Sequence, residues 1–462
     1  MSDRQVDVAA VIDKSAISRF QVVIFAFCFL IMMIDGFDTQ AVAYVAPSLA
    51  AEWRISPGAM GLFFSAALLG SMLGGLLFGQ IIDKYGRQRS IGVCIAIFGI
   101  LNIVSAYTTS IEAFIVVRFL CGIGLGGAIP NVVALVTEYS PARSRATAVA
   151  VTMCGIAMGA VLGGLVSIPL ISRFGWTSVF ILGGVLPLLL LPIVIAVLPE
   201  SIKFLILSKR HNGKIASILA RIDPAGHYSA GDEYVLDETR TSQGSILTLF
   251  RSDLVVGSIF LSGAFFMSLL LVYCFIMWIP LLLKQAGLPL HDAILGTVIF
   301  NLAGMLGSFI CTRIVDRNSR HTYATLLLGY LLGAVAVASI GFAGTTFWPI
   351  MIAIFFSGFL VIGVQLSLFA AISNYYPTDI RGTGLGWTLM VGRTGSLIGP
   401  MVGSALVAQG MTTGQLFQTS SIAPLLACIS LLVFVKLSPA REGDVAERTL
   451  AGEQKMAGGS DM

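Results

Sequence analysis

The chain alternates long apolar runs with short polar loops. A helix that crosses a bilayer needs about 20 apolar residues, and six such runs are expected at residues 20–47, 59–82, 90–107, 112–139, 146–171 and 177–198. A polar stretch at 199–251 precedes six more, expected at 253–283, 292–314, 322–343, 347–374, 382–408 and 415–436. This pattern predicts an all-α integral membrane protein with twelve transmembrane helices. The first run lacks a small-residue cleavage site, so we expect a span rather than a cleaved leader.

The composition indicates that lipid, rather than water, covers most of the surface. Of the 462 residues, 11% are charged and 56% are hydrophobic, whereas soluble domains carry about 25% charged residues. A soluble fold and a nucleic-acid partner are therefore not expected. The seven cysteines are scattered singly in or beside apolar runs, and the four histidines lie in loops or at span edges. We therefore expect no metal site and no cofactor.

The lysines and arginines are distributed unequally between the two sides of the predicted membrane domain. With the N-terminus placed in the cytoplasm, 23 of the 28 basic residues fall on the cytoplasmic side, three fall outside, and two lie within spans. Loops that carry an excess of Lys and Arg stay on the cytoplasmic side. The bias predicts a multi-pass protein with both termini in the cytoplasm.

The second half of the chain resembles the first. A shift of 236 residues produces identities that include Gly122/Gly358, Tyr139/Tyr375, Pro141/Pro377, Arg145/Arg381, Gly159/Gly395 and Gly163/Gly399. Two six-helix halves repeated in parallel are typical of transporters whose site lies between the halves at the membrane midplane. We expect an N-tail at 1–19, a first half at 20–198, a cytoplasmic central loop at 199–251, a second half at 252–437 and a cytoplasmic C-tail at 438–462.

The loop after the second run carries a specific motif, Gly79-Gln-Ile-Ile-Asp83-Lys84-Tyr-Gly86-Arg87-Gln-Arg89. It resembles the cytoplasmic signature of the major facilitator superfamily, G-x-x-x-D-[RK]-x-G-[RK]-x-[RK]. A carboxylate beside a basic cluster could form a latch between the halves, whereas simple positive-inside anchoring would explain the arginines only. The cytoplasmic gate is expected to comprise Asp83, Arg87, Glu138, Arg145, Asp316 and Arg381, with Glu138 expected to act together with Arg145.

The first apolar run contains Asp35-Gly36-Phe37-Asp38, which resembles the D-G-x-D motif of the aromatic acid:proton symporters. That family includes bacterial 4-hydroxybenzoate and benzoate carriers. The resemblance extends over nearly the whole chain, including Arg118-Phe-Leu-Cys-Gly-Ile-Gly, Leu198-Pro-Glu-Ser and Tyr376-Pro-Thr-Asp-Ile-Arg-Gly. It implies proton-driven uptake of an aromatic carboxylate across a bacterial inner membrane. Ala160 stands where drug antiporters of the superfamily carry a proline, which disfavours that alternative.

Four ionisable side chains lie within apolar runs: Asp35, Asp38, Arg118 and Arg393. Each costs about 2.5–3.5 kcal/mol at the centre of a membrane helix, so each is a functional candidate. Asp38 and Arg118 lie at similar predicted depths and could pair, with Asp35 nearly one turn deeper. The group could exchange a proton, or it could be a structural ion pair. Arg393 could bind the substrate carboxylate through its planar fork, or it could be structural.

Three further side chains are candidates for the substrate cavity: Tyr44, Gln365 and Trp387, although an aromatic or amide side chain in a span usually serves packing.

Together with the resemblance, the sequence favours a monomeric, non-enzymatic proton symporter for a small aromatic carboxylate. A sugar or polyol symporter is the closest alternative, because such carriers share a P-E-S element after the sixth span. A membrane substrate sensor and a membrane enzyme are less favoured, since the tails are short and no catalytic arrangement lies in the spans.

Overall fold

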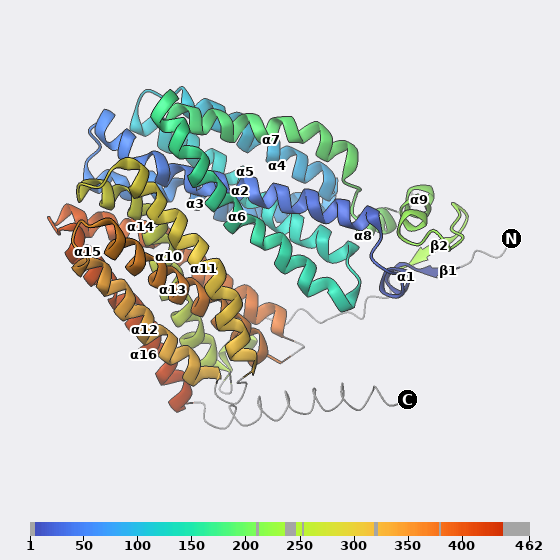
Figure 1. Cartoon of the computed structure of the whole chain (residues 1–462). Coiled ribbons are helices and arrows are strands. Elements are labelled where there is room, and N and C mark those ends of the chain that lie inside the picture. The colour runs from blue at the N-terminus through green and yellow to red at the C-terminus, as the bar shows by residue number, and fades with distance from the viewer. Residues whose placement is uncertain are drawn as a thin grey trace. The chain divides into compact units, whose positions relative to one another are not determined.

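The computed structural model describes residues 5–208, 212–235, 246–251, 254–317, 322–377 and 380–437, with backbone only at 79–84 and 316–317. Contacts between Cα atoms divide the chain into two compact units. Unit 1 comprises Met1–Arg54 and Ala66–Arg240, and unit 2 comprises Ile55–Ser65 and Thr241–Met462. Long helices dominate both units (Figure 1).

Unit 1 contains the helices expected for the first half of the repeat. These are α2 (Arg19–Glu52), most of α3 (Pro57–Tyr85), α4 (Arg87–Ala106), α5 (Ile111–Tyr139), α6 (Arg145–Phe174) and α7 (Thr177–Val197), with the short η1 (Ala142–Ser144) before α6. Helix α2 begins at a capping box, in which Ser18 and Gln21 satisfy each other's backbone N–H groups. It continues five residues past the expected end at Pro47, and Trp176 Nε1 donates to Glu52 at its last turn (2.8 Å).

Unit 2 contains the second set of helices and the start of α3. Its elements are η2 (Ile246–Phe250), α10 (Val255–Gln285), α11 (Leu290–Arg317), α12 (Thr322–Phe342), α13 (Phe347–Tyr375), α14 (Arg381–Ala408), α15 (Thr413–Ser420) and α16 (Ile422–Leu437). The start of α3 lies against α14: Ser65 Oγ donates to the Leu397 carbonyl (2.9 Å), and Ser404 Oγ donates to the Pro57 carbonyl (2.6 Å).

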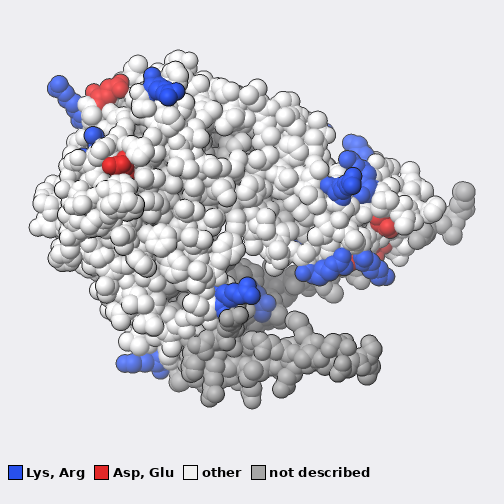
Figure 2. Space-filling model, viewed as in Figure 1, with Lys and Arg blue, Asp and Glu red and all other residues white. Residues whose placement is uncertain are grey.

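Eleven segments of the described chain are long and apolar enough to span a membrane. Helix α14 has the length of a span, but its seven glycines and two arginines lower its hydropathy. It packs along α10, as α6 packs along α2, so it occupies the place that the repeat assigns to an eleventh long helix. On the face shown in Figure 2, charged side chains lie mainly near the helix ends and leave a broad uncharged surface, as contact with lipid requires.

The glycines paired by the sequence repeat occupy equivalent helix crossings. A side chain at Gly159 would collide with the Met33 carbonyl where α6 crosses α2, and one at Gly395 would collide with the Phe266 carbonyl where α14 crosses α10. Small residues at such crossings let membrane helices approach closely. The internal repeat predicted from the sequence is therefore present in the packing of each unit.

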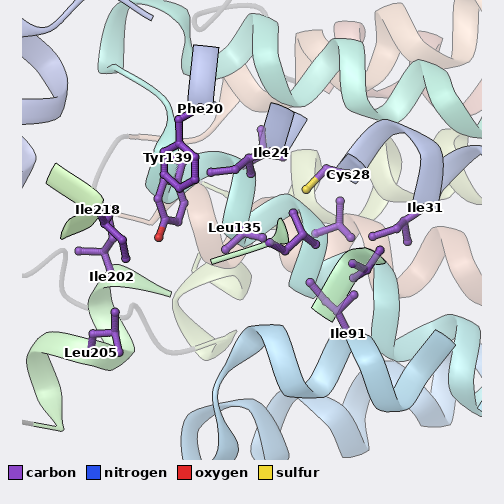
Figure 3. Packing of buried hydrophobic residues seen from close by; sticks show 14 of the residues in the cluster. Phe20, Ile24, Cys28, Ile31, Ile91, Leu135, Tyr139, Ile202, Leu205 and Ile218 are labelled. Carbon is purple, nitrogen blue, oxygen red and sulfur yellow. The ribbon is translucent and has the colours of Figure 1, made fainter. Parts of the chain in front are cut away.

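The polar segments at the N-terminus and after α7 fold together, although the sequence indicated only a tail and a loop. Strand β1 (Gln5–Asp7) pairs in parallel with β2 (Glu233–Val235), beside α1 (Val8–Lys14), α8 (Ile202–Leu207) and α9 (Asn212–Ile222) (Figure 1). We call these five elements the terminal cap. Their apolar side chains continue the core of unit 1, in which the rings of Phe20 and Tyr139 lie close together, with Ile202, Leu205 and Ile218 nearby (Figure 3).

Candidate functional site: a buried aspartate–arginine pair

The strongest electrostatic feature of unit 1 is an ion pair between α2 and α5. Arg118 Nη2 lies 2.8 Å from Asp38 Oδ2, and Arg118 Nη1 lies 3.0 Å from Asp38 Oδ1, so the contact is bidentate. Nη2 also lies 3.3 Å from the Asp38 carbonyl oxygen. Both side chains are fully buried. The pair that the sequence suggested on grounds of depth is therefore present.

Three neighbours of Arg118 were not singled out from the sequence. Asn102 Oδ1 on α4 accepts from Arg118 Nη1 at 2.9 Å. The ring of Phe180 on α7 faces the guanidinium, 5.4 Å from its carbon to the ring centroid, and the Cys121 sulfur lies 3.7 Å from Nη1. Asn102 could have been identified from the sequence as an amide inside an apolar run, because a buried polar group needs a hydrogen-bond partner.

Asp35 lies on α2 nearly one turn before Asp38 and is also buried, with 4% of its surface exposed. Helix α2 packs closely on α6 at this level, where a side chain at Gly36 would collide with the Ile156 carbonyl. The D-G-x-D segment thus combines two buried carboxylates with a close helix crossing. Two carboxylates and one guanidinium in a low-dielectric interior can hold or release a proton when the arrangement of partners changes.

The other predicted substrate residues occupy different surroundings. Tyr44 is fully buried, with its hydroxyl 2.6 Å from the Ala160 carbonyl, so it packs α2 against α6. Trp387 is half-buried, donates to the Ser258 carbonyl at 3.2 Å and meets the ring of Phe250 edge-on. Both therefore serve packing in this conformation.

Gln365 on α13 is buried, with 7% of its surface exposed, while Arg393 on α14 is exposed. Four glycines of α14 lie against α10, namely Gly392, Gly395, Gly399 and Gly403, whereas Arg393 is exposed. Among the described residues, no carboxylate lies within 4 Å of its guanidinium. Arg393 is therefore exposed, whereas Arg118 is fully buried in its ion pair.

A second polar cluster joins the start of α4 to the end of α5. Arg87 Nη2 lies 2.8 Å from Glu138 Oε1, so the two side chains form an ion pair. Ser201 Oγ donates to Glu138 Oε2 at 2.6 Å. Arg145, which was expected to act with Glu138 in the gate, is exposed at the first turn of α6. The ion pair of Glu138 is thus formed with the more distant Arg87, and a joint role of Glu138 and Arg145 in a gate stays a prediction.

Glu200 belongs to the P-E-S element, Pro199-Glu200-Ser201, and its contacts show what this element does in the fold. Its Oε1 accepts from the backbone N–H groups of Arg87 (2.6 Å) and Gln88 (3.1 Å), so it caps the N-terminus of α4. Gly86 precedes them with φ of 86°, and a side chain there would meet the Glu200 carboxylate. Glycine is needed at this position for both reasons. We call Arg87, Glu138, Glu200 and Ser201 the α4–α5 cluster.

Four predicted gate residues lie outside this cluster: Arg145, described above, and Asp83, Asp316 and Arg381. The side chains of Asp83 and Asp316 lie outside the described residues. Arg381 begins α14, where its Nε lies 3.5 Å from the Tyr376 carbonyl.

Long membrane-spanning helices in two repeated units, with a buried charge pair in unit 1, are typical of secondary transporters. The family described as Major Facilitator Superfamily matches residues 28–400 and again 261–457. The chain belongs to this superfamily. It is therefore a multi-pass membrane transporter rather than an enzyme, and the predicted fold class is confirmed.

Curated relatives and solved structures agree with this assignment. The chain is 33% identical to a gallate transporter of Pseudomonas putida over 93% of its length and 95% of the relative. It is 34% identical to the 4-hydroxybenzoate transporter PcaK of Acinetobacter baylyi, over 92% and 94% of the two chains. The fold matches the inward open xylose transporter XylE of E. coli with a TM-score of 0.69 at 19% identity, over 90% and 96% of the two chains.

Proposed function

We propose that the chain imports a small aromatic carboxylate together with protons by alternating access. The observation that carries the proposal is the fully buried Asp38–Arg118 pair. The relatives named for gallate and 4-hydroxybenzoate support the choice of substrate class. Sugar or polyol symport is the alternative, and a substrate sensor would bind without transport.

The pair can couple to a proton because the state with Asp38 ionised and the state with Asp38 protonated differ strongly in energy. With Asp38 ionised, Arg118 has a counterion inside the protein. A proton on Asp38 removes that charge and leaves a buried cation, an arrangement that costs several kcal/mol unless another anion compensates it. We infer that proton binding changes the net charge inside unit 1 by one unit and thereby favours a different conformation of the transporter.

Substrate recognition is assigned to Arg393. Its guanidinium is exposed and has no carboxylate within 4 Å among the described side chains. A guanidinium binds a carboxylate through two parallel hydrogen bonds, which suits a benzoate-like anion. Gln365 remains a candidate for the same site, whereas Tyr44 and Trp387 are assigned to packing.

The α4–α5 cluster, together with Asp83, Arg145, Asp316 and Arg381, is proposed to form the cytoplasmic gate. We expect both termini in the cytoplasm, as the distribution of basic residues predicts. A location in a bacterial inner membrane is what the resemblance to the aromatic acid:proton symporters implies. We expect the chain to act as a monomer. A reporter enzyme active only outside the cytoplasm, fused after the first and the second span, tests the orientation.

Transport by purified protein in liposomes tests the proposed function directly. Uptake of radiolabelled 4-hydroxybenzoate, gallate, benzoate and xylose would be compared with and without an inward proton gradient. We expect accumulation of an aromatic acid that collapses when a protonophore is added. Accumulation of xylose alone would establish the sugar alternative, binding without uptake would indicate a sensor, and uptake driven by a sodium gradient would refute proton coupling.

A further inference from the structure

Asn102 lies on α4, fully buried beside the ion pair. Its Nδ2 lies 3.1 Å from the Phe98 carbonyl one turn earlier, which fixes the amide so that Oδ1 faces Arg118. The distance from Oδ1 to Arg118 Nη1 is 2.9 Å. Asn102 therefore provides Arg118 with an acceptor that does not depend on the protonation of Asp38.

The remaining surroundings of Asp38 and Arg118 contain few groups that could take over this role. Helix α2 contributes Asp35, and α5 contributes the Cys121 thiol, 3.9 Å from Asp38 Oδ2. The charged residues of α4 and α6 lie at the helix ends, namely Arg87, Arg89, Arg145 and Arg173, and α7 has no charged residue. α7 presents Phe180, whose ring attracts the cation but offers no acceptor oxygen. Arg118 Nε is buried without a hydrogen-bond partner among the described residues.

We propose that Asn102 is a positioning residue that sets the pH at which Asp38 takes up the coupling proton. The inference rests on the proposed proton coupling. When Asp38 is ionised, its carboxylate already satisfies Arg118, and Asn102 adds little. When Asp38 is protonated, Arg118 has lost its counterion and is left with uncharged acceptors, namely the remaining acceptor oxygen of Asp38 and the Asn102 oxygen, so the Asn102 hydrogen bond contributes a larger share. Asn102 thus stabilises the protonated state more than the ionised state.

The direction of the effect follows from that difference. Removing the Asn102 oxygen destabilises the protonated state selectively, so a higher proton concentration is needed to reach it. A hydrogen bond to a charged group is strong enough to move the pH midpoint of transport by about one unit, which is a tenfold change in proton concentration. Asn102→Leu should therefore move the midpoint to more acidic pH. Asn102→Asp keeps an acceptor for Nη1, so its midpoint should stay at or above the wild-type value.

Asn131 provides a matched control on α5. It is also fully buried, and its Nδ2 likewise donates to the carbonyl one turn earlier, that of Gly127. It lies 13 residues beyond Arg118, about 20 Å along the helix axis. Asn131→Leu therefore removes a buried amide of the same kind without removing a partner of Arg118, and its midpoint should equal that of the wild type.

The experiment measures uptake of 4-hydroxybenzoate into proteoliposomes as a function of external pH for the wild type and the three variants, at equal membrane content. Asn102→Ala replaces Asn102→Leu if the latter fails to reach the membrane. An acid shift confined to the variant without the oxygen supports the inference. Equal midpoints, or the same acid shift in Asn102→Asp or Asn131→Leu, would overturn it while leaving proton coupling intact. Wild-type uptake that ignores a protonophore would instead refute the proposed coupling, and this inference with it.

Discussion

Replacing Asp38 by asparagine tests what the buried pair does. The substitution keeps the size of the side chain and removes its charge. Arg118 then loses its carboxylate partner but keeps the Asn102 oxygen at 2.9 Å and the residue-38 carbonyl at 3.3 Å. A coupled carrier with a permanently neutral residue 38 resembles the protonated state. It should exchange substrate across the membrane but should not accumulate it.

The size of the structural effect follows from the burial of the pair. Both partners are fully buried, and removing one partner of a buried ion pair costs about 3–5 kcal/mol. The oxygens that remain, including the amide oxygen of the new asparagine, place Asp38→Asn near the lower end of that range. A purely structural pair predicts a loss of folded protein in the membrane, and Asp38→Asn combined with Arg118→Gln should restore the yield because no unpaired charge remains.

Three measurements on the single variants and the double variant separate these roles: membrane yield, substrate counterflow and proton-driven accumulation. Coupling predicts that Asp38→Asn retains counterflow and loses accumulation, and that the double variant does not regain accumulation. A structural pair predicts that accumulation returns with the yield in the double variant. Normal accumulation by Asp38→Asn would refute both interpretations.

Three further predictions concern other parts of the molecule. Arg87→Ala breaks the α4–α5 cluster, so it should slow turnover roughly tenfold, about 1.4 kcal/mol in the barrier, with little change in substrate Kd. Initial rates measure the turnover and calorimetry measures the Kd. An equal loss of substrate binding would contradict a role in a gate. Arg393→Lys should raise KM for an aromatic acid roughly tenfold, because lysine lacks the planar fork; an unchanged KM would make Arg393 structural. Gly159→Ala should destabilise unit 1 by about 1–3 kcal/mol, because its Cβ would collide with the Met33 carbonyl, whereas Gly386→Ala, with open space around it, should not. Equal thermal stability of these two glycine variants would contradict the close crossing.

The sequence predicted features that depend on local hydropathy or on the cost of an isolated charge. The ends of the long helices lie within a few residues of the expected spans, because a bilayer demands a minimum apolar length. Asp38 and Arg118 could be paired because few charges lie inside the spans and each needs compensation. The internal repeat was visible because small residues are required wherever two helices cross closely, as at Gly159 and Gly395.

Features that depend on contacts between distant segments could not be predicted from the sequence. Glu138 pairs with Arg87, 51 positions earlier in the chain, and not with the nearby Arg145. The terminal cap pairs Gln5–Asp7 with Glu233–Val235, and neither strand is long enough to be recognised by its own pattern. Asn102 was overlooked because an amide carries no net charge, although in a low-dielectric interior it influences a neighbouring cation strongly.

The contacts of unit 1 indicate how a proton could act without unfolding it. Helices α4 and α5 are joined at two levels, by Asn102 with Arg118 and by Arg87 with Glu138. Helix α2 is joined to α5 by Asp38 and, near its other end, by Gln21 Nε2, which donates to the Tyr139 carbonyl at 2.7 Å. In the proposed mechanism, a proton on Asp38 would weaken one of these links and leave the others in place. We therefore expect its main effect to be a change of charge inside a unit that keeps its shape, as rigid-body alternating access requires.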